Sequence, residues 1–493
     1  MPAVTATRPN EDPRVNGLLS GAEWSTRDLT FSFPQSAVSY GSRYGDGEPQ
    51  YGFEAFNPAQ KAAIRDVLAG YSAVCDVSFT EIGETLSRQA DLRFAESDLP
   101  STAWSYLPTS LPEGGDAWFN NSRGIFDQPL KGEYAYVALI HEIGHGLGLK
   151  HPHEASGRFG AMPTSVDSGE YTVMSYRSYT GASTSGGGYT NEPSGFAQSL
   201  MMYDIAALQA LYGANYDSNG ANTSYRWSPT SGEMFIDGKG EGAPSANRIF
   251  LTIWDGGGVD SYDFSAYSSD LRISLAAGAW STTKSAQLAE LHFDGSEQAA
   301  GNIANALLHD GDRRSLIENA EGGSGDDTIS GNTGRNTLSG GMGHDRLVGL
   351  GGQDRLHGGR GSDTLLGRAG DDFLLGGGGK DSLRGGAGED SFVFESADQG
   401  FDRISSFNSA NDTIRIDASG FGGGLAAADK LVAGEGFIAG ADPVATEAEG
   451  TFLYDRGGGI LSWDPDGTGA GDAVAIARLA GHAALNAGDI LIV

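Results

Sequence analysis

The stretch HEIGHGLGLKHPHE, residues 141–154, contains four of the nine histidines in the chain. Histidine is the commonest metal ligand in proteins, so this cluster points to a metal site. His141 and His145 are four residues apart and share one face of an expected helix, where both rings can hold one ion. Gly148 can adopt the left-handed conformation that ends a helix, and the returning chain then brings His151 to the same ion. Three neutral imidazoles that leave one position open are typical of catalytic zinc.

Two neighbours of these histidines complete the expected chemistry. Glu142 directly follows the first ligand and can take a proton from an activated water molecule. Pro152 prevents the helix from continuing beyond the third ligand. The fourth histidine, His153, has no place in the spacing, and we expect it to be solvated.

A second motif lies downstream in YTVMSYRSY, residues 171–179. It supplies Met174 and, two residues later, Tyr176. The spacing H-E-x-x-H-x-x-G-x-x-H followed by a methionine turn is far more specific than H-E-x-x-H alone. The competing interpretation, a histidine-rich surface turn, explains neither the spacing nor the second motif. The segment 179–195 that follows is glycine-rich, and the sequence does not decide whether it covers a cleft.

The elements that must position this site are visible in the periodicity of the chain. Alternating apolar and polar residues predict strands, the last of them at a sheet edge, at 28–33, 76–82, 91–97 and 115–122. Apolar patterns with cap or stop residues predict helices at 57–74, 134–148 and 199–213. Together they predict one mixed domain of helices and strands that ends near residue 230. Residues 1–16 show no such pattern and are expected to be a flexible leader.

The composition limits what the chain can bind. The 493 residues include 64 acidic and 32 basic side chains, which gives a net charge of −32. A nucleic acid is not expected as a partner, because phosphate binding needs a basic surface. The one cysteine, Cys75, can form no intrachain disulfide and is expected to be a small buried residue on a strand. The sequence has no run of 18 apolar residues, so no membrane span is expected.

Residues 322–393 repeat with a period of nine, in eight units without insertion, from GGSGDDTIS to GGAGEDSFV. The eighth position is always a large apolar residue, as expected where a side chain faces a core. The second unit has Asn336 at the sixth position, and the others have an aspartate there: Asp327, Asp345, Asp354, Asp363, Asp372, Asp381 and Asp390. This is the nonapeptide pattern of a calcium-binding parallel β-helix.

The physical chemistry of the repeat supports that assignment. Its glycines permit turns with positive φ that direct carbonyl oxygens and one carboxylate between stacked coils. Oxygen ligands in a flexible cage suit Ca²⁺ better than Mg²⁺ or Zn²⁺. One apolar residue in nine makes a thin core, so bound calcium must supply part of the folding free energy. The site of Asn336 is expected to be weaker or empty. A flexible glycine-rich linker, the alternative, does not keep eight units in register.

These motifs occur together with blocks that resemble the serralysins, the RTX-type secreted zinc proteases of the metzincin clan. The blocks stand in family order and include GAEWSTRDLTFSF, GDAWFNN, YDIAALQALYGAN and SLIENAEGGSGDD. The resemblance covers nearly the whole chain. It implies an α+β metzincin catalytic domain followed by an all-β, calcium-binding parallel β-roll (RTX) domain. The expected bounds are 1–16 for a leader or propeptide, 17–245 for the protease domain and 246–493 for the β-roll and β-sandwich domain.

The resemblance also implies roles for single residues. It assigns one zinc ion to three histidines and a movable tyrosine: His141, His145, His151 and Tyr176. It makes Glu142 the general base, lets Tyr176 stabilise the oxyanion, and places Met174 beneath the metal. The residues expected to bind an extended peptide by strand addition are Ala117, Trp118, Phe119 and Asn120.

Calcium sites outside the repeats are a further feature of the family. Their expected ligands in this chain are Asp255, Gly257, Gly258, Asp260, Glu318 and Asp402. Backbone groups near Asn219, Ala221 and Thr223 are further candidates, although SNGANTSY departs from the family wording there.

The ends of the chain bear on its location. The first residues lack the apolar core of a secretory signal peptide. The C-terminal DILIV resembles the uncleaved secretion signal of the family, and its alternative interpretation is a last β-strand. We therefore expect a monomeric zinc endopeptidase that bacterial type I secretion machinery exports to the extracellular space, where calcium fills the repeats. Protein substrates and a proteinaceous inhibitor are its expected partners.

Three other functions share part of these features. An RTX adhesin or surface-layer protein has the repeats but no use for the histidine motif. An RTX lipase needs a G-x-S-x-G motif, which the sequence lacks. A metzincin that binds zinc without catalysis is expected to lack a catalytic residue, whereas all of them are present here.

Overall fold

A computed structural model describes residues 2–41, 44–85, 88–184, 188–428 and 430–493. Residues 185–187 of the glycine-rich segment 179–195 are therefore outside the described residues. The chain divides into two compact units. The first unit comprises Met1–Thr223, Trp227–Gly258 and Ala277–Ser315; the second comprises Ser224–Arg226, Val259–Ala276 and Leu316–Val493.

The first unit is built around a five-stranded sheet in the order β4-β3-β5-β7-β6. Its strands are β3 (Asp28–Ser32), β4 (Ser78–Glu81), β5 (Leu92–Ser97), β6 (Ala103–Ser105) and β7 (Ala117–Asn120). β6 is antiparallel to β7, and the other neighbouring strands are parallel. The four predicted strands are present. β7, however, is not at the edge, because β5 and β6 pair with it on its two sides. The strands at the two edges are β4 and β6, and β6 was not among the strands predicted from the sequence.

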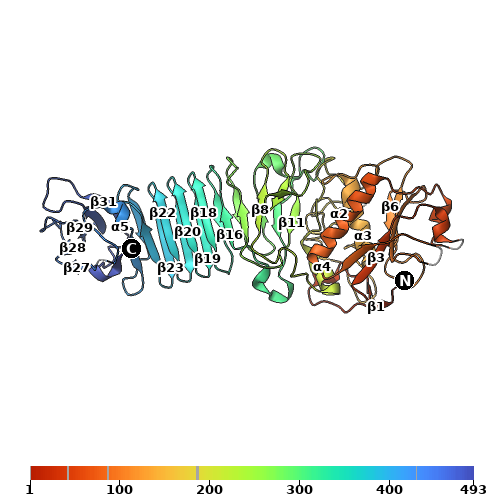
Figure 1. Cartoon of the computed structure of the whole chain (residues 1–493), viewed down its shortest axis with the longest axis horizontal. Coiled ribbons are helices and arrows are strands. Elements are labelled where there is room, and N and C mark those ends of the chain that lie inside the picture. The colour runs from red at the N-terminus through yellow and green to blue at the C-terminus, as the bar shows by residue number, and fades with distance from the viewer. Residues whose placement is uncertain (1, 42–43, 86–87, 185–187, 429) are drawn as a thin grey trace. The chain divides into compact units, whose positions relative to one another are not determined.

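Three long helices accompany this sheet, namely α2 (Pro58–Val74), α3 (Tyr134–Gly146) and α4 (Met202–Tyr212) (Figure 1). Asn57 caps α2 and forms a capping box with Gln60, as expected for a cap residue followed by proline. Buried apolar side chains of the helices and the sheet share one core that includes Tyr71, Leu139 and Leu208. This core holds α3, the helix with the histidine motif. None of the described helices has the length and apolar character needed to cross a membrane.

The residues expected to form a flexible leader are folded into the first unit. β1 (Val4–Ala6) pairs with β2 (Ala22–Trp24), and a short helix, α1 (Pro13–Asn16), follows β1. Thr7 and Val15 are buried, and Val15 belongs to the core. The prediction of a flexible leader is therefore wrong for residues 2–16, because strand pairing and an apolar contact hold them. Cleavage of a propeptide stays a prediction.

The first unit also extends beyond the expected domain boundary at residue 245. β11 (Leu251–Ile253), β14 (Trp280–Ser281) and β15 (Ile303–Asn305) form a three-stranded sheet, and β9 (Met234–Ile236) pairs with β10 (Lys239–Gly240). Phe250, Trp254 and Ala304 pack into the same core as the helices. The boundary at 245 therefore lies inside this unit, because burial of these side chains ties the later strands to it. Cys75, expected on a strand, is instead buried at the C-terminal end of α2.

The second unit is a parallel β-roll whose successive strands alternate between two sheets (Figure 1). One sheet contains β8 (Ser224–Trp227), β12 (Ser261–Asp263), β16 (Asn319–Glu321), β18 (Thr337–Met342), β20 (Arg355–Arg360), β22 (Phe373–Gly378), β24 (Ser391–Phe394), β26 (Thr413–Ile416) and β32 (Ile490–Ile492). The other contains β13 (Arg272–Ser274), β17 (Thr328–Ser330), β19 (Arg346–Gly351), β21 (Thr364–Ala369), β23 (Ser382–Ala387) and β25 (Asp402–Ser405).

Each coil of the roll comprises two nine-residue units. Each strand of the repeat pairs in parallel with the second strand after it in chain order. In one such pair, β19 and β21, Leu347 faces Leu365. The eighth residues of all the units are at most 1% exposed: Ile329, Leu338, Leu347, Leu356, Leu365, Leu374, Leu383 and Phe392. The predicted core position of the repeat is thereby confirmed.

The C-terminal part of the second unit closes the roll. β27 (Val432–Ala433), β28 (Gly436–Gly440), β29 (Thr451–Asp455), β30 (Ile460–Asp464) and β31 (Val474–Leu479) extend the second sheet, and α5 (Ala418–Phe421) precedes them. The terminal DILIV contributes β32, which pairs with β26 and buries Ile490 and Ile492. Its interpretation as a last strand is confirmed, and its use as a secretion signal stays a prediction.

Candidate metal centre and repeat carboxylates

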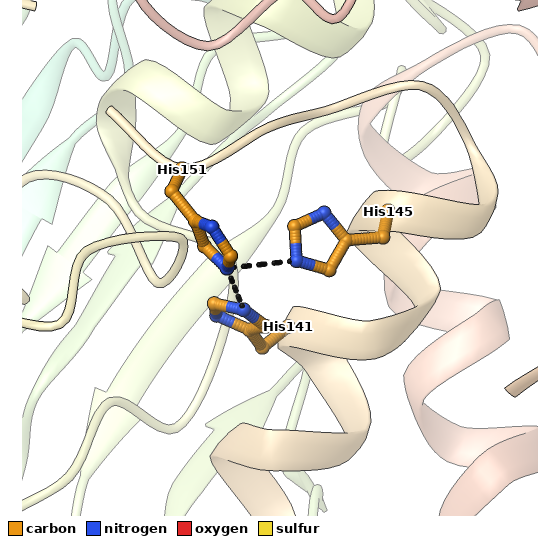
Figure 2. A group of neighbouring side chains, drawn as sticks. All are labelled: His141, His145 and His151. Carbon is orange, nitrogen blue, oxygen red and sulfur yellow. Dashed lines mark hydrogen bonds between the residues drawn. The ribbon is translucent and has the colours of Figure 1, made fainter. Parts of the chain in front are cut away.

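The three histidines of the motif converge in the first unit. His141 and His145 extend from α3, and His151 extends from the loop that follows (Figure 2). Nε2 of His151 lies 3.2 Å from Nε2 of His141 and 3.0 Å from Nε2 of His145. On one tetrahedral zinc ion, ligand atoms with bonds of 2.0–2.1 Å lie about 3.3–3.4 Å apart. These two distances are close to that spacing, and ligand atoms of all three residues lie within 4.8 Å of one another, so a single ion fits among them.

The opposite nitrogen of each ring has an acceptor that fixes the orientation of the ring. Nδ1 of His141 lies 2.8 Å from the carbonyl oxygen of Val173, and Nδ1 of His145 lies 2.9 Å from that of Leu149. Nδ1 of His151 lies 3.0 Å from Oε1 of Glu154. Partners of this kind place the proton on Nδ1 and leave Nε2 free for a metal.

Burial keeps these imidazoles neutral, as metal ligands must be. It holds the pKa of His141 well below its ordinary value, with His145 and His151 as further causes. Burial also lowers the pKa of His145 and lowers that of His151 to about 3. The cluster therefore offers three lone pairs at neutral pH rather than a positive charge.

The loop that returns His151 begins at Gly148, as the spacing predicts. Gly148 has φ +102°, and a side chain there would meet the carbonyl oxygen of Ala22 at 2.4 Å. The backbone N–H of Lys150 donates to the carbonyl of Leu18 at 2.7 Å, and the buried Lys150 ammonium donates to that of Gly17 at 2.5 Å. The N-terminal segment therefore braces the loop that carries the third ligand.

The methionine turn is held from α4. Oδ2 of Asp204 accepts from the backbone N–H of Val173 at 2.8 Å, and its Oδ1 accepts from the hydroxyl of Thr172. Met174 is fully buried and contacts α3 at Gly144. Since the carbonyl of Val173 orients His141, one chain of contacts runs from Asp204 through the turn to the metal centre. Asp204 was not among the site residues predicted from the sequence.

Glu142 and Tyr176 lie beside the three histidines. Burial raises the pKa of Glu142 to about 8, and its Oε2 accepts no hydrogen bond from any residue that the structure describes. The Tyr176 ring stacks on His141 with ring centroids 5.7 Å apart, and its centroid is 4.3 Å from that of His151. Burial, and then the charge of Glu142, raise the pKa of Tyr176 above its ordinary value. Its hydroxyl is therefore a proton donor at neutral pH.

One aromatic neighbour of Tyr176 was not predicted from the sequence. Tyr189 donates its hydroxyl to the carbonyl of Ser175 at 3.0 Å, and its ring meets Tyr176 edge-on at 6.5 Å. Its only signal in the sequence is a bulky side chain within the glycine-rich segment 179–195. The contact gives that segment a fixed point beside the metal centre.

His153 is only partly exposed, rather than fully solvated as expected. Its ring stacks on that of His151 with centroids 5.6 Å apart, and its Nδ1 is buried. Pro152 ends the regular spacing but does not carry the chain away from the site, so His153 stays against the third ligand.

The repeat aspartates of the second unit form two rows of buried carboxylates, one beside each sheet. Oδ1 of each accepts from a backbone N–H one coil earlier, as in the 2.8 Å bond from Asp345 to Asp363. Oδ2 is buried and accepts no hydrogen bond from any described residue in Asp345, Asp354, Asp363, Asp372, Asp381 and Asp390. Burial raises the pKa of Asp345 to about 7. Unpartnered buried oxygens are costly, which makes both rows suitable for cations.

Backbone carbonyls lie close to these free oxygens. A side-chain carbon built on Gly358 would lie 2.4 Å from Oδ2 of Asp363 and 2.5 Å from the carbonyl oxygen of Gly376. A carboxylate and a carbonyl from successive coils therefore border the same small space, and only glycine leaves that space open.

The first two nine-residue repeats differ from the other repeats. Asp327 accepts from the backbone N–H of Leu271 and Gly323 with its two oxygens, at 2.8 and 2.7 Å. The side-chain amide of Asn336 donates to the carbonyl of Glu318 at 3.0 Å. Both side chains are thus satisfied within the protein, and the expectation of a weaker site at Asn336 stays a prediction.

Two aspartates continue the rows beyond the regular repeat. Asp402 accepts from the N–H of Asp381 at 2.9 Å, and Asp412 accepts from that of Asp390 at 3.1 Å. Asp402 was predicted from the sequence as a calcium ligand, and Asp412 was not. The signal for Asp412 was present, because Ile414 stands two residues after it, as the apolar residue does in every repeat.

The other expected calcium ligands belong to separate units. In the first unit, Oδ1 of Asp255 accepts from the N–H of Gly257 at 2.8 Å, and Gly257 and Gly258 have φ +144° and +143°. In the second, Oε2 of Glu318 accepts from the N–H of Asp260 at 2.8 Å. Their use as calcium sites stays a prediction.

The loop near residue 220 belongs to the first unit. The hydroxyl of Thr223 donates to the carbonyl oxygens of Asn219 and Ala221, at 3.2 and 2.8 Å. These two contacts hold near one hydroxyl the two carbonyls that the family resemblance suggests as ligands, and their role as ligands stays a prediction.

Comparison with known proteins places these features in a family context. Residues 214–435 match the family model for the serralysin C-terminal part of the M10 peptidases. Serralysin A of Dickeya chrysanthemi is 34% identical over 308 residues, 61% of this chain and 58% of that protein. Metallopeptidase AprA of Pseudomonas marginalis is 31% identical, with 61% of this chain and 59% of that protein covered. Metalloprotease AprA of Pseudomonas entomophila is 31% identical, with coverage of 64% and 63%. The matched part thus spans less than two thirds of these relatives.

The chain combines a mixed unit of helices and strands, which holds a three-histidine cluster, with a parallel β-roll of nonapeptide repeats. These two features define its class: a repeat protein with a candidate metal centre. Within that class, the family model and the relatives show that this chain is similar to the serralysins over about three fifths of its length. The resemblance expected from the sequence is thereby confirmed.

Proposed function

We propose that this chain is a secreted zinc endopeptidase of the metzincin type, and that calcium folds and stabilises its β-roll. The observation that carries the proposal is the convergence of three imidazole Nε2 atoms beside a buried carboxylate, Glu142, on α3. The printed names of the relatives, serralysin and metalloprotease, support it. The repeats alone are equally compatible with an adhesin, but an adhesin has no use for this cluster.

The residues present fit a zinc ion. Three neutral imidazole nitrogens form a donor set that suits zinc, and an acceptor on the other nitrogen of each ring strengthens it. His141, His145 and His151 would hold the ion, with Tyr176 beside them. A zinc ion bound there supplies a Lewis acid for the scissile carbonyl, and its charge favours the ionised form of Glu142.

The proposed chemistry of the chain is general acid–base catalysis. Glu142 accepts a proton from the attacking water while the water oxygen bonds to the carbonyl carbon. It then returns a proton to the amide nitrogen as the C–N bond breaks. Tyr176 donates its hydroxyl proton in a hydrogen bond to the developing oxyanion, an interaction worth about 3 kcal/mol in comparable sites.

For substrate binding we propose the edge strand β6 in place of Ala117–Asn120. Strand addition needs unpaired backbone groups, and both sides of β7 are already paired. β6 borders α3, since a side-chain carbon on Gly146 would lie 3.5 Å from Oγ of Ser105. A peptide paired with β6 therefore lies next to the helix that carries His145. β7 pairs with the other side of β6.

The proposed role of calcium follows from the repeat carboxylates. Unpartnered Oδ2 atoms in a thin core destabilise the roll unless a cation binds them. Extracellular sites with dissociation constants of about 10⁻⁴–10⁻³ M stay empty in the cytosol and fill outside the cell. The roll would thus remain unfolded before export by type I secretion machinery and fold afterwards.

The test compares Glu142→Ala with the wild-type protein in casein hydrolysis at millimolar calcium. The variant should keep its zinc, measured by elemental analysis, and lose at least about 10²–10⁴-fold in turnover. A zinc chelator should abolish wild-type activity, and added Zn²⁺ should restore it. Full turnover in Glu142→Ala would rule out the assigned base, and chelator-resistant hydrolysis would rule out the metal.

A further inference from the structure

A second group of metal-ligating side chains lies next to the proposed zinc site. One ring nitrogen each of His151 and His153 and a carboxylate oxygen of Glu154 lie within 4.8 Å of one another. Among the residues that the structure describes, this group and the three-histidine cluster are the two sets of such residues gathered this closely. The proposed function uses His151 but has no role for His153.

The environment of His153 makes it available to an ion. Its Nδ1 is buried and has no hydrogen-bond partner among the described residues. Its ring is nearly parallel to that of His151, at an interplanar angle of 14°, and its centroid is 5.6 Å from that of Tyr176. A buried imidazole nitrogen without a partner has lost its contact with water and gained nothing in return. A cation at this nitrogen would remove that cost.

Glu154 contributes a negative charge to the group, and its exposed side chain gives an ion access from solvent. Its side chain is 50% exposed, and its Oε1 lies 3.0 Å from Nδ1 of His151. Ligand atoms with bonds of 2.0–2.2 Å on a tetrahedral zinc ion lie about 3.3–3.5 Å apart, so a small movement of the exposed carboxylate admits an ion. Two imidazoles and one carboxylate suit zinc-class ions better than calcium, which prefers oxygen ligands.

We propose that His153, Glu154 and Nδ1 of His151 form a second, regulatory site for a zinc-class divalent ion. The ion takes the place of the proton that Nδ1 of His151 shares with Glu154, and that proton leaves to solvent. A carboxylate on Nδ1 makes an imidazole a stronger ligand. The second ion removes the contact of Nδ1 with Oε1 of Glu154 that orients the His151 ring. Two divalent cations on opposite nitrogens of one ring also repel each other, so excess zinc lowers activity. The effect on activity rests on the proposed function, whereas the binding does not.

The binding test is calorimetric titration of the calcium-saturated, full-length protein with Zn²⁺. The wild-type protein should bind two equivalents. His153→Ala should bind the first normally and the second at least about 10–100-fold more weakly. The matched control is His309→Ala, because Nε2 of His309 lies 3.6 Å from Oδ2 of Asp310 but has no third ligand nearby among the described residues. It should keep both equivalents. A wild-type protein with one equivalent, or equal loss in both variants, overturns the proposal.

Peptide hydrolysis at rising zinc concentration tests the regulatory effect. Activity of the wild-type protein and of His309→Ala should fall as the second equivalent binds, and activity of His153→Ala should not. At one equivalent of zinc, His153→Ala should match the wild-type protein within about twofold. Hydrolysis with one bound zinc and no second equivalent would reject the regulatory site alone. Absence of hydrolysis would reject the proposed function, and calorimetry would still decide the second site.

Discussion

The sulfur of Met174 lies 2.7 Å from the position that a side-chain carbon on Gly144 would take. Gly144 lies in the turn of α3 between His141 and His145, and Met174 is fully buried. The helix and the methionine turn therefore meet with no space for a methyl group. This contact sets the distance between the turn and the helix that holds two of the three imidazoles.

Gly144→Ala should destabilise the protein, although alanine is the better helix former. The added methyl group overlaps Met174 and approaches the hydroxyl of Tyr71, and such overpacking costs about 1–3 kcal/mol. Calorimetry of the zinc- and calcium-loaded protein should show a lower Tm. The double variant Gly144→Ala with Met174→Ala should lose less than the sum of the two single variants. Additive losses would mean that the two residues do not press on each other.

Tyr176→Phe should lower kcat by about 10²-fold and change KM much less, because the lost hydrogen bond forms mainly in the transition state. Steady-state kinetics with a peptide substrate measures both constants. The matched control is Tyr189→Phe, which removes a hydroxyl that donates to the carbonyl of Ser175. A change confined to KM in Tyr176→Phe would make Tyr176 a contact for substrate binding only.

Asp372→Asn should raise the calcium concentration needed to fold the β-roll. The substitution removes the charge from a buried carboxylate whose Oδ2 has no hydrogen-bond partner among the described residues. Fewer charged ligands weaken a calcium site, and we expect a loss of about tenfold at this position. Circular dichroism during calcium titration of the full-length protein measures the midpoint. Asp371→Asn is the control, because Asp371 adjoins Asp372 in sequence but is exposed. Equal shifts in both variants would point to general electrostatics.

Glu96→Gln should change how stability depends on pH. Burial, and then the charges of Glu54 and Asp127, raise the pKa of Glu96 to about 7 from its ordinary 4.5. The folded state therefore binds a proton that the unfolded state has released at intermediate pH. Wild-type stability from this source is complete below pH 4.5 and is lost as the pH rises through 7. Glu96→Gln lacks that loss.

Thermal unfolding at fixed high calcium measures the effect of Glu96. The Tm of Glu96→Gln relative to the wild-type protein should rise between pH 5 and pH 8 and then level off. Glu11→Gln, a change at an exposed glutamate, should show no such trend. A Tm difference that stays constant from pH 5 to pH 8 would contradict the raised pKa of Glu96.

Much of the metal centre follows from local spacing. Residues four apart on a helix share a face, so His141 and His145 could be paired without a structure. Gly148 marked the turn that returns His151, and its φ of +102° agrees with that prediction. His153 could not be placed in this way. Its position against His151 depends on the course of the chain after Pro152 and on the rings that surround it.

The order of the strands in the sheet could not be predicted from the pattern of apolar and polar residues alone. Ala117–Asn120 has the alternation of a strand, but alternation does not say whether another strand pairs beside it. β6 has three residues, too few for a periodic signal, and yet it takes the edge position. The N-terminal residues are similar, since β1 has three residues and is held by pairing with β2.

By itself, the sequence determined the three-histidine motif with Glu142, the nine-residue period of the β-roll and the buried position of its eighth residues. Each depends on spacing along a helix or a coil, which the backbone geometry makes regular. Only the tertiary structure decided which strand lies at the sheet edge, how the N-terminal segment braces the ligand loop, and which carboxylate oxygens stay without partners. Those features depend on contacts between residues far apart in the chain, and no local period encodes them.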